Sequence, residues 1–304
     1  MKESFYFGID GGGTHSRLAL INGAGEILAR TEAGSTNIYS VKKEEVFENL
    51  SGLLKDALRE SGLKKEAIAA GCLGSAGLGR EGERKIFREF FDVILSPETP
   101  VKLCTDGEIL LCGGLGSLEG YCLIAGTGSV AWGRSADGRL VRSGGLGYML
   151  GDEGAAAWIG RTAIARSLRS LEGRDLPTAM MPVILEACKR EQAPELIQYV
   201  HHDADKAQIA ALAPVVTAAA RNGDPLALDI LNTGAAELVL LVRSVREQSP
   251  WIKNQALVLA GGVIEHDEIL TRILRESLSK EFPRLSVGSP KGSALEGACM
   301  LAKE

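Results

Sequence analysis

Apolar positions divide the first third of the chain into alternating and helical stretches. Residues 5–9, 16–21 and 27–31 alternate as strands, and the turn NGAGE separates the last two. From Lys43 to Ser61 the apolar residues recur at helical spacing. The stretch that follows predicts a strand in AIAAGCLGSAG, a helix over 81–92, a strand in VKLCTDG and a helix that includes EILLCGGL. The predicted order is βββαβαβα.

The same opening returns in the second half of the chain. YCLIAGTGSVAWG predicts a strand, a glycine turn and a returning strand, and ADGRLVRSGG predicts the next hairpin turn and strand. Helical stretches follow at 155–171, 178–199, 206–222 and 225–247, then a strand in ALVLAGG and two further helices. This duplication predicts an α/β protein with two related domains around a central cleft and a helical insertion in the second domain.

The border between the predicted domains falls in a glycine-rich connection at residues 113–120. We expect an N-terminal domain over residues 1–117 and a C-terminal domain over residues 118–304. Because a helix at the end of a chain often packs back on an earlier domain, the last helix is a candidate member of the first domain.

Composition narrows the class of protein. The 304 residues are 45% hydrophobic and 24% charged, and the net charge of −5 argues against a nucleic-acid or membrane surface, which would be basic. The N-terminal apolar run is too short for a signal peptide, so we expect a cytoplasmic protein. The six cysteines form no CxxC pair and the four histidines have no zinc-ligand spacing, which favours reduced core thiols over a metal site.

The glycine turn in FGIDGGGTHSRLAL is the first candidate for chemistry. A P-loop and a dinucleotide-binding loop both lead into a helix, whereas this turn leads into a strand. It is therefore a hairpin turn, whose backbone N–H groups and threonine hydroxyl can bind an anion. A tight hairpin that needs glycine for positive φ is the structural alternative. That alternative explains less well why GTGS occupies the equivalent place in the second half.

A third glycine turn, in LAGGVIEHDE, ends a late strand and begins a helix. Gly261 and Gly262 leave room there for a flat group such as adenine and its ribose. Taken alone the signal is weak, because a strand, two glycines and a helix are also common packing.

These three turns, in this order, resemble the actin, Hsp70 and sugar-kinase superfamily. GGLGYMLGDEGAAAWIG, at residues 144–160, is similar to the GDEG signature of the N-acetylglucosamine kinase group within the BadF/BadG/BcrA/BcrD ATPase family. The resemblance covers nearly the whole chain, and the GDEG block is its most specific part. It implies two RNase H-like (actin-like ATPase) domains and an ATP-dependent enzyme.

The resemblance implies two sets of residues for ATP. The first glycine turn would hold the terminal phosphates from one side, through Gly12, Gly13 and Thr14. The second would hold them from the other, through Gly126, Thr127, Gly128 and Ser129. Thr217 and Ala220, in TAAARNGDPLALDIL, are looser candidates for the adenine pocket, since alanines are also good helix formers.

Two aspartates are assigned to the chemistry. Asp10 ends the first strand beside the phosphates, where a carboxylate needs an intervening cation, so we assign it to Mg²⁺ through a water. Stabilisation of the turn by its side chain is the alternative. Asp106 follows a strand at the position where related kinases carry the catalytic base that accepts the sugar hydroxyl proton. Its structural alternative is a helix N-cap.

The resemblance also implies a sugar site. Asn37 matches the sugar-contacting asparagine of the family, and Gly145, Gly147 and Asp152 match its sugar-binding loop. Glu153 and Ser75 are secondary candidates, and Asp106 would also touch the sugar. Leu146 departs from the family, because many of these kinases carry an aromatic residue there. N-acetylglucosamine, glucosamine and other amino sugars therefore remain open as substrates.

Three functions compete. The first is an ATP- and Mg²⁺-dependent kinase that phosphorylates an amino sugar at O6, as a homodimer like many related kinases. The second is an ATPase activator of a 2-hydroxyacyl-CoA dehydratase or benzoyl-CoA reductase, which would need cysteines for a shared [4Fe–4S] cluster. The chain has the GDEG loop in the region where those cysteines belong. The third is a non-catalytic sugar sensor, for which no helix-turn-helix precedes Phe5.

Overall fold

The computed structural model describes residues 4–304, and their contacts separate into two compact units. Among the described residues, the first unit contains residues 4–120, the segment Arg134–Arg139 and the segment Pro290–Glu304. The second contains Tyr121–Gly133 and Leu140–Ser289. The segment 290–304 thus groups with the first unit; the sequence-based division places it in residues 118–304, with the last helix as a candidate member of the first domain. The division at residue 117 stays a prediction about which part of the chain binds the sugar and which part binds the nucleotide.

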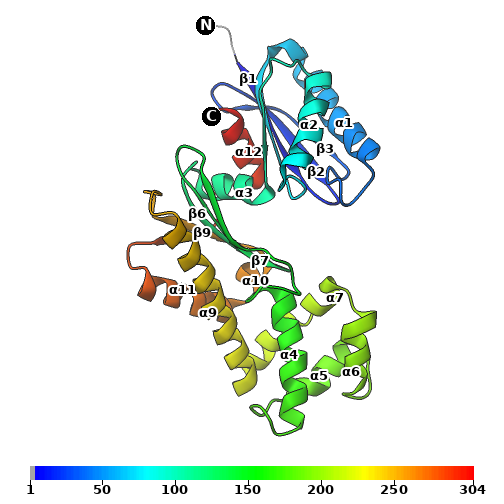
Figure 1. The fold of residues 1–304 in the computed structure, drawn as a ribbon, viewed down its shortest axis with the longest axis vertical. Coiled ribbons are helices and arrows are strands. Elements are labelled where there is room, and N and C mark those ends of the chain that lie inside the picture. The colour runs from blue at the N-terminus through cyan, green and yellow to red at the C-terminus, as the bar shows by residue number, and fades with distance from the viewer. Residues whose placement is uncertain (1–3) are drawn as a thin grey trace. The chain divides into compact units, whose positions relative to one another are not determined.

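The first unit is a five-stranded sheet with helices, in the predicted order βββαβαβα (Figure 1). Its sheet order is β3-β2-β1-β4-β5, with β1 antiparallel to β2 and parallel to β4. Its elements are β1 Phe5–Gly11, β2 Ser16–Asn22, β3 Ile27–Ala33, α1 Lys43–Ser61, β4 Ile68–Ser75, α2 Glu81–Ile94, β5 Val101–Cys104 and α3 Asp106–Leu115, with a 3₁₀ turn at Lys65–Ala67.

The second unit repeats this topology. Its sheet order is β10-β9-β6-β7-β8. Read from β8, this order places the third, second, first, fourth and fifth strands of the unit as in the first sheet. Its strands are β6 Gly120–Ala125, β7 Ser129–Arg134, β8 Leu140–Gly144, β9 Ala256–Ala260 and β10 Ser286–Gly288. Its helices are α4 Ala156–Leu171, α5 Met180–Ala187, α6 Glu195–Gln198, α7 Lys206–Ala210, α8 Ala213–Arg221, α9 Pro225–Gln248, α10 Gly262–His266 and α11 Glu268–Glu281, with a π turn at Tyr199–Asp203. The repeated α/β architecture predicted from the sequence is confirmed.

Two of the predicted helices are broken in the structure. The stretch 178–199 contains α5 and α6, separated where Lys189 takes a positive φ of 53°. The stretch 206–222 contains α7 and α8. Pro214 lies in the first turn of α8, where a backbone N–H has no partner within the helix, so the N–H that proline lacks is not missed. Apolar periodicity continues across both breaks, which is why the sequence predicted single helices.

The last helix, α12 Ala294–Ala302, packs on α3 and β1 of the first unit. Glycines allow this close approach: a Cβ at Gly113 would lie 1.9 Å from Ser293 O, and one at Gly297 would lie 1.8 Å from Ile109 O. Ser293 and Glu296 form a capping box that begins the helix. α12 is therefore an integral element of the first unit.

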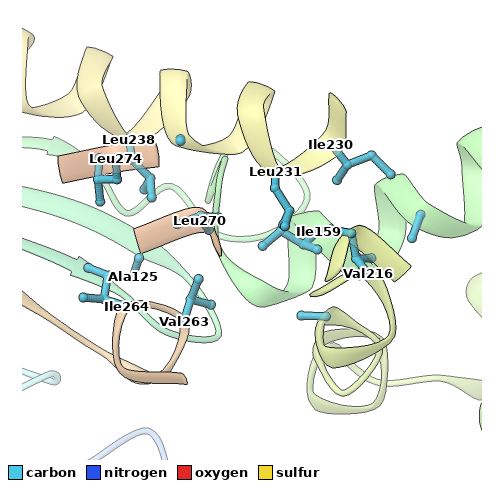
Figure 2. Close-up of a cluster of buried hydrophobic side chains, with 14 of the residues drawn as sticks. Ala125, Ile159, Val216, Ile230, Leu231, Leu238, Val263, Ile264, Leu270 and Leu274 are labelled. Carbon is cyan, nitrogen blue, oxygen red and sulfur yellow. The ribbon is translucent and has the colours of Figure 1, made fainter. Parts of the chain in front are cut away.

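The core of the second unit surrounds the long helix α9. Figure 2 shows Ile230, Leu231 and Leu238 gathered with side chains of neighbouring elements, among them Ile159 and Leu270, and all five are fully buried. α9 is also long and apolar enough to cross a membrane by length and composition alone. Because ten of its residues are buried in this core, we interpret α9 as a core helix.

Candidate active site

The first glycine turn, Gly12–His15, joins β1 to β2 and is fixed by hydrogen bonds. The N–H of Gly12 donates to His15 O at 3.1 Å, and Gly12 O accepts the N–H of Thr36 at 3.2 Å. A Cβ at Gly12 would lie 2.3 Å from His15 O, so a larger residue does not fit. Gly13 and Thr14 are exposed at the tip. The turn is thus rigid at its base and open to solvent at the residues predicted to bind phosphate.

Asp10 lies next to this turn, directly opposite Arg17 of β2. Arg17 Nη2 donates to Asp10 Oδ2 at 2.7 Å, and the two side chains are 52% and 19% exposed. A pair that remains in contact with water contributes roughly 0–1 kcal/mol to stability. Asp10 therefore already has a weakly held cationic neighbour, at the position predicted for Mg²⁺.

Asp106 is the first residue of α3, and its surroundings tune its acidity. Thr105 is the N-cap, because its hydroxyl accepts the N–H of Glu108 at 3.3 Å, so the alternative that Asp106 caps the helix is wrong. Loss of water around the carboxylate raises the pKa of Asp106 above its ordinary value. The negative charge of Asp10 also raises this pKa, whereas a hydrogen bond from the backbone of Gly107 lowers it. A carboxylate with a raised pKa is a better proton acceptor.

Asn37 and Ser75 both lie next to the first glycine turn. Asn37 directly follows Thr36, which binds Gly12, and its Oδ1 accepts the N–H of Tyr39 at 2.9 Å. Ser75 pairs with Gly11 across β1 and β4 and is fully buried, with its Oγ 3.4 Å from the N–H of Gly77 that donates to it. The structure thus brings the predicted phosphate and sugar residues of the first unit together, although Ser75 supports a turn rather than facing solvent.

The second glycine turn, Gly126–Ser129, joins β6 to β7 and is held by the start of α4. Gly126 O accepts the N–H of Ala156 at 2.9 Å, and Thr127 O accepts the N–H of Ala157 at 3.3 Å. Ser129 Oγ donates to Glu153 O at 2.8 Å. The second turn and the GDEG block, Gly151–Gly154, therefore form one hydrogen-bonded structure.

Asp152 is the buried acidic residue of the GDEG block. Its side chain is 4% exposed, its Oδ1 accepts the N–H of Ser129 at 3.3 Å, and its Oδ2 accepts Lys206 Nζ at 2.9 Å. The sequence predicts a sugar contact for Asp152, whereas in the structure both oxygens have protein partners. Lys206 was not predicted as a site residue, because nothing in the sequence links it to a residue so far back in the chain.

The loop Gly145–Leu150 precedes the GDEG block and exposes apolar side chains. Gly145 and Gly147 have φ values of 69° and 85°, which favour glycine, and the N–H of Gly145 donates to Ser129 O at 2.8 Å. Leu146, where the sequence departs from the family, is 61% exposed, and Met149 and Leu150 are also exposed. The predicted sugar loop is therefore tied to the second turn at its start and solvent-facing beyond it.

A cavity of about 580 Å³ lies beside the second turn, a size typical of small-molecule sites. Thr217 Oγ1 donates to Asp267 Oδ2 at 2.6 Å and braces one wall. The cavity is lined by Gly126, Thr127, Ala156, Ala210, Ala211, Ala213, Pro214, Thr217, Arg221, Gly262, Val263, His266 and Asp267. The structure thus brings the predicted phosphate turn, Thr217 and Gly262 to one cavity, as expected for a nucleotide pocket, and adds a wall of small residues.

Two residues predicted for this pocket lie outside its lining. Ala220 is a buried residue of α8. Gly261 has a φ of 104°, and a Cβ there would lie 2.5 Å from Ala125 O, so it allows β9 to turn into α10 close to β6. The sequence did not predict that Ala210–Pro214 line this pocket, because alanine and proline carry no functional group that would indicate a binding site.

The family model of the BadF/BadG/BcrA/BcrD ATPase family matches residues 7–302. The chain therefore belongs to this family, and the resemblance seen in the motifs is confirmed.

Its relatives are amino-sugar kinases. An N-acetylmuramic acid/N-acetylglucosamine kinase from Clostridium acetobutylicum is 34% identical over 301 residues, which cover 98% of both chains. An N-acetyl-D-glucosamine kinase from Dictyostelium discoideum is 27% identical, with 99% of this chain and 98% of that one covered. Among solved structures, a proposed N-acetylglucosamine kinase from Chromobacterium violaceum has a TM-score of 0.71 and 28% identity, covering 98% of this chain and 99% of that one. The predicted fold class is confirmed.

Proposed function

We propose that the protein is an ATP-dependent kinase that phosphorylates a hydroxyl group, O6, of an amino sugar. The observation that carries the proposal is the cavity of nucleotide size beside Gly126 and Thr127, residues of the predicted phosphate turn, in a chain of this ATPase family. The kinase names of relatives that match over the full chain support it. We propose N-acetylglucosamine or glucosamine as the substrate, and the first of these relatives adds N-acetylmuramic acid as a candidate.

The reaction requires a positioned hydroxyl and a group that accepts its proton. We propose that Asp106 accepts the hydroxyl proton, because its raised pKa suits a general base. The O6–phosphorus bond forms as the bond between the γ-phosphorus and the β-phosphate oxygen breaks, and ADP leaves. We assign the sugar to Asn37, Gly145 and Gly147, with Asp152 and Glu153 beside them.

Mg²⁺ supplies charge neutralisation at the transferring phosphoryl group when it is bound. Within residues 4–304 no group of three His, Cys, Asp or Glu side chains is suited to a metal ion. A complete protein cage is not needed, because Mg²⁺ is held through one or two carboxylates together with phosphates and waters. Asp10, which is partly exposed beside the first turn, fits this requirement, and we propose that it holds Mg²⁺ through a water.

The remaining assignments follow from the same proposal. Residues 1–117 would bind sugar and phosphate, and residues 118–304 would bind the nucleotide. We propose that the protein is a cytoplasmic homodimer without nucleic-acid or membrane partners. Light scattering of the purified chain tests the oligomeric state. The activator function has no supporting observation here, since all six cysteines are buried.

The deciding experiment measures ADP release with a panel of sugars. N-acetylglucosamine, glucosamine and N-acetylmuramic acid are compared with glucose, and ³¹P NMR of the product identifies the phosphorylated oxygen. We expect an amino sugar to raise turnover well above the basal ATPase rate, and its 6-deoxy analogue to have no effect. If no sugar raises ADP release, the kinase proposal fails.

A further inference from the structure

The helical insertion of the second unit, the segment between α4 and α9, places Lys206 beside Asp152, which contacts the second glycine turn. Lys206 is the first residue of α7, where Asp205 caps the helix in a capping box with Gln208. α7 packs against α4, the helix that begins at the turn. Lys206 Nζ lies 2.9 Å from Asp152 Oδ2 and 6.0 Å from the centre of the Tyr148 ring. The insertion therefore contacts both the GDEG block and the loop before it.

The position of the Asp152 carboxylate is closely determined. Asp152 has a φ of 62°, in the left-handed region that residues other than glycine rarely adopt. A Cβ at Gly128 would lie 2.6 Å from Asp152 Oδ2, so the carboxylate packs directly on the backbone of the turn. On the same side, its Oδ1 accepts the N–H of Ser129. Any movement of this carboxylate therefore moves the turn.

Lys206 is the cationic partner of this buried carboxylate. Asp152 is 4% exposed, and a buried carboxylate without a cation is strongly unfavourable. Without Lys206 the remaining hydrogen-bond partner of the side chain would be one N–H at 3.3 Å, so the carboxylate would turn toward solvent. This change loosens the contact with Gly128 and Ser129.

We propose that Lys206 is a positioning residue for the nucleotide phosphates, acting through Asp152 on the turn Gly126–Ser129. The inference rests on the proposed function, because it takes this turn to be the phosphate-binding one. It gives the insertion a role: the segment between α4 and α9 fixes the shape of the second turn. The lysine itself touches no phosphate.

Binding of ADP and of adenosine, measured by calorimetry, tests the proposal. Adenosine lacks phosphates and reports on the pocket, whereas ADP reports on pocket and turn together. For Lys206→Met we expect ADP affinity to fall about tenfold or more, which corresponds to about 1.4 kcal/mol, with adenosine affinity unchanged. Lys206→Arg keeps the charge and should restore most of the ADP affinity.

The matched control is Arg190→Met, which breaks the ion pair with Asp203 (2.7 Å) in the same insertion, away from Asp152. It should leave ADP affinity unchanged. The double variant Lys206→Met/Asp152→Asn removes the uncompensated charge and should bind ADP better than the sum of the two single effects predicts.

Equal losses of ADP and adenosine binding in Lys206→Met, or no loss in either, would overturn the proposal. The failure of the kinase proposal is a separate result: a chain that binds ADP with this dependence on Lys206, but whose turnover no sugar stimulates, keeps the positioning role and loses the activity.

Discussion

The two glycine turns occupy the same place in two sheets of the same topology, yet they are supported differently. The turn Gly12–His15 is held at its base by Thr36 and has the half-exposed pair Asp10–Arg17 beside it. The turn Gly126–Ser129 is held along its length by α4 and the GDEG block, and the buried Asp152 beside it is paired with the partly exposed Lys206. A shared topology therefore fixes where a turn lies, while its surroundings decide how freely it and its charges can move.

This difference suits two tasks. The proposed role of the first turn, beside Mg²⁺ and a general base, needs charges that can exchange partners, and the partly solvated Asp10 provides one. A turn that only holds phosphates gains from being preorganised, because no rearrangement is then needed on binding. The predictions below test whether chemistry depends on the first unit and rigidity on the second.

The largest effect is expected for Asp106→Asn in the first unit. Loss of the general base should lower kcat about 10²- to 10⁴-fold, with ADP affinity unchanged. Steady-state kinetics and calorimetry measure the two quantities. Asp92→Asn, an exposed carboxylate on α2, is the control and should keep full activity. A normal kcat in Asp106→Asn would remove the chemistry from the first unit.

Adding a methyl group to each turn should destabilise the fold by different amounts, because the second turn is more tightly packed than the first. Gly128→Ala places a Cβ 2.6 Å from Asp152 Oδ2 and should destabilise the fold by about 1–3 kcal/mol, as overpacking does. Gly13→Ala places one 3.1 Å from Ser40 Oγ, an exposed side chain that can rotate, so its loss should be below about 1 kcal/mol. Chemical denaturation measures both, and equal losses would contradict the comparison.

The two ion pairs should differ in the same direction. Arg17→Gln breaks the exposed pair and should change the free energy of unfolding by about 0–1 kcal/mol. Lys206→Met leaves Asp152 buried without its cation and should cost more, although Lys206 is itself partly exposed. Denaturation at low and high salt tests this, and salt should screen the Arg17 contribution more strongly than the Lys206 contribution.

The smallest effect is a shift in pH dependence. Because Asp106 must be ionised to accept a proton, kcat should fall as pH drops through its pKa. That pKa is raised, so the acid limb should lie above the pH range of an ordinary aspartate. A kcat profile across the acid range measures the limb. A limb at or below the ordinary range would show that the first unit does not hold Asp106 as described.

The sequence predicted local features well and distant contacts poorly. The strands and hairpins around both glycine turns were readable, because alternation and turn residues act over a few positions. The short strand β10 went unseen, since three residues carry no period. The partnership of Asp152 with Lys206 depends on how α7 packs against α4, and no pattern along the chain encodes it. The Thr217–Asp267 contact escaped for the same reason.

The close contact of α12 with α3 and β1 has a consequence for how the chain is made. Domains usually fold in the order of their synthesis. Here the first sheet cannot complete its packing until residues 290–304 have emerged, after the whole second unit. During translation, the surfaces of Gly113 and Gly8 that receive α12 stay bare. A tag or truncation within residues 290–304 would therefore damage the unit at the opposite end of the chain.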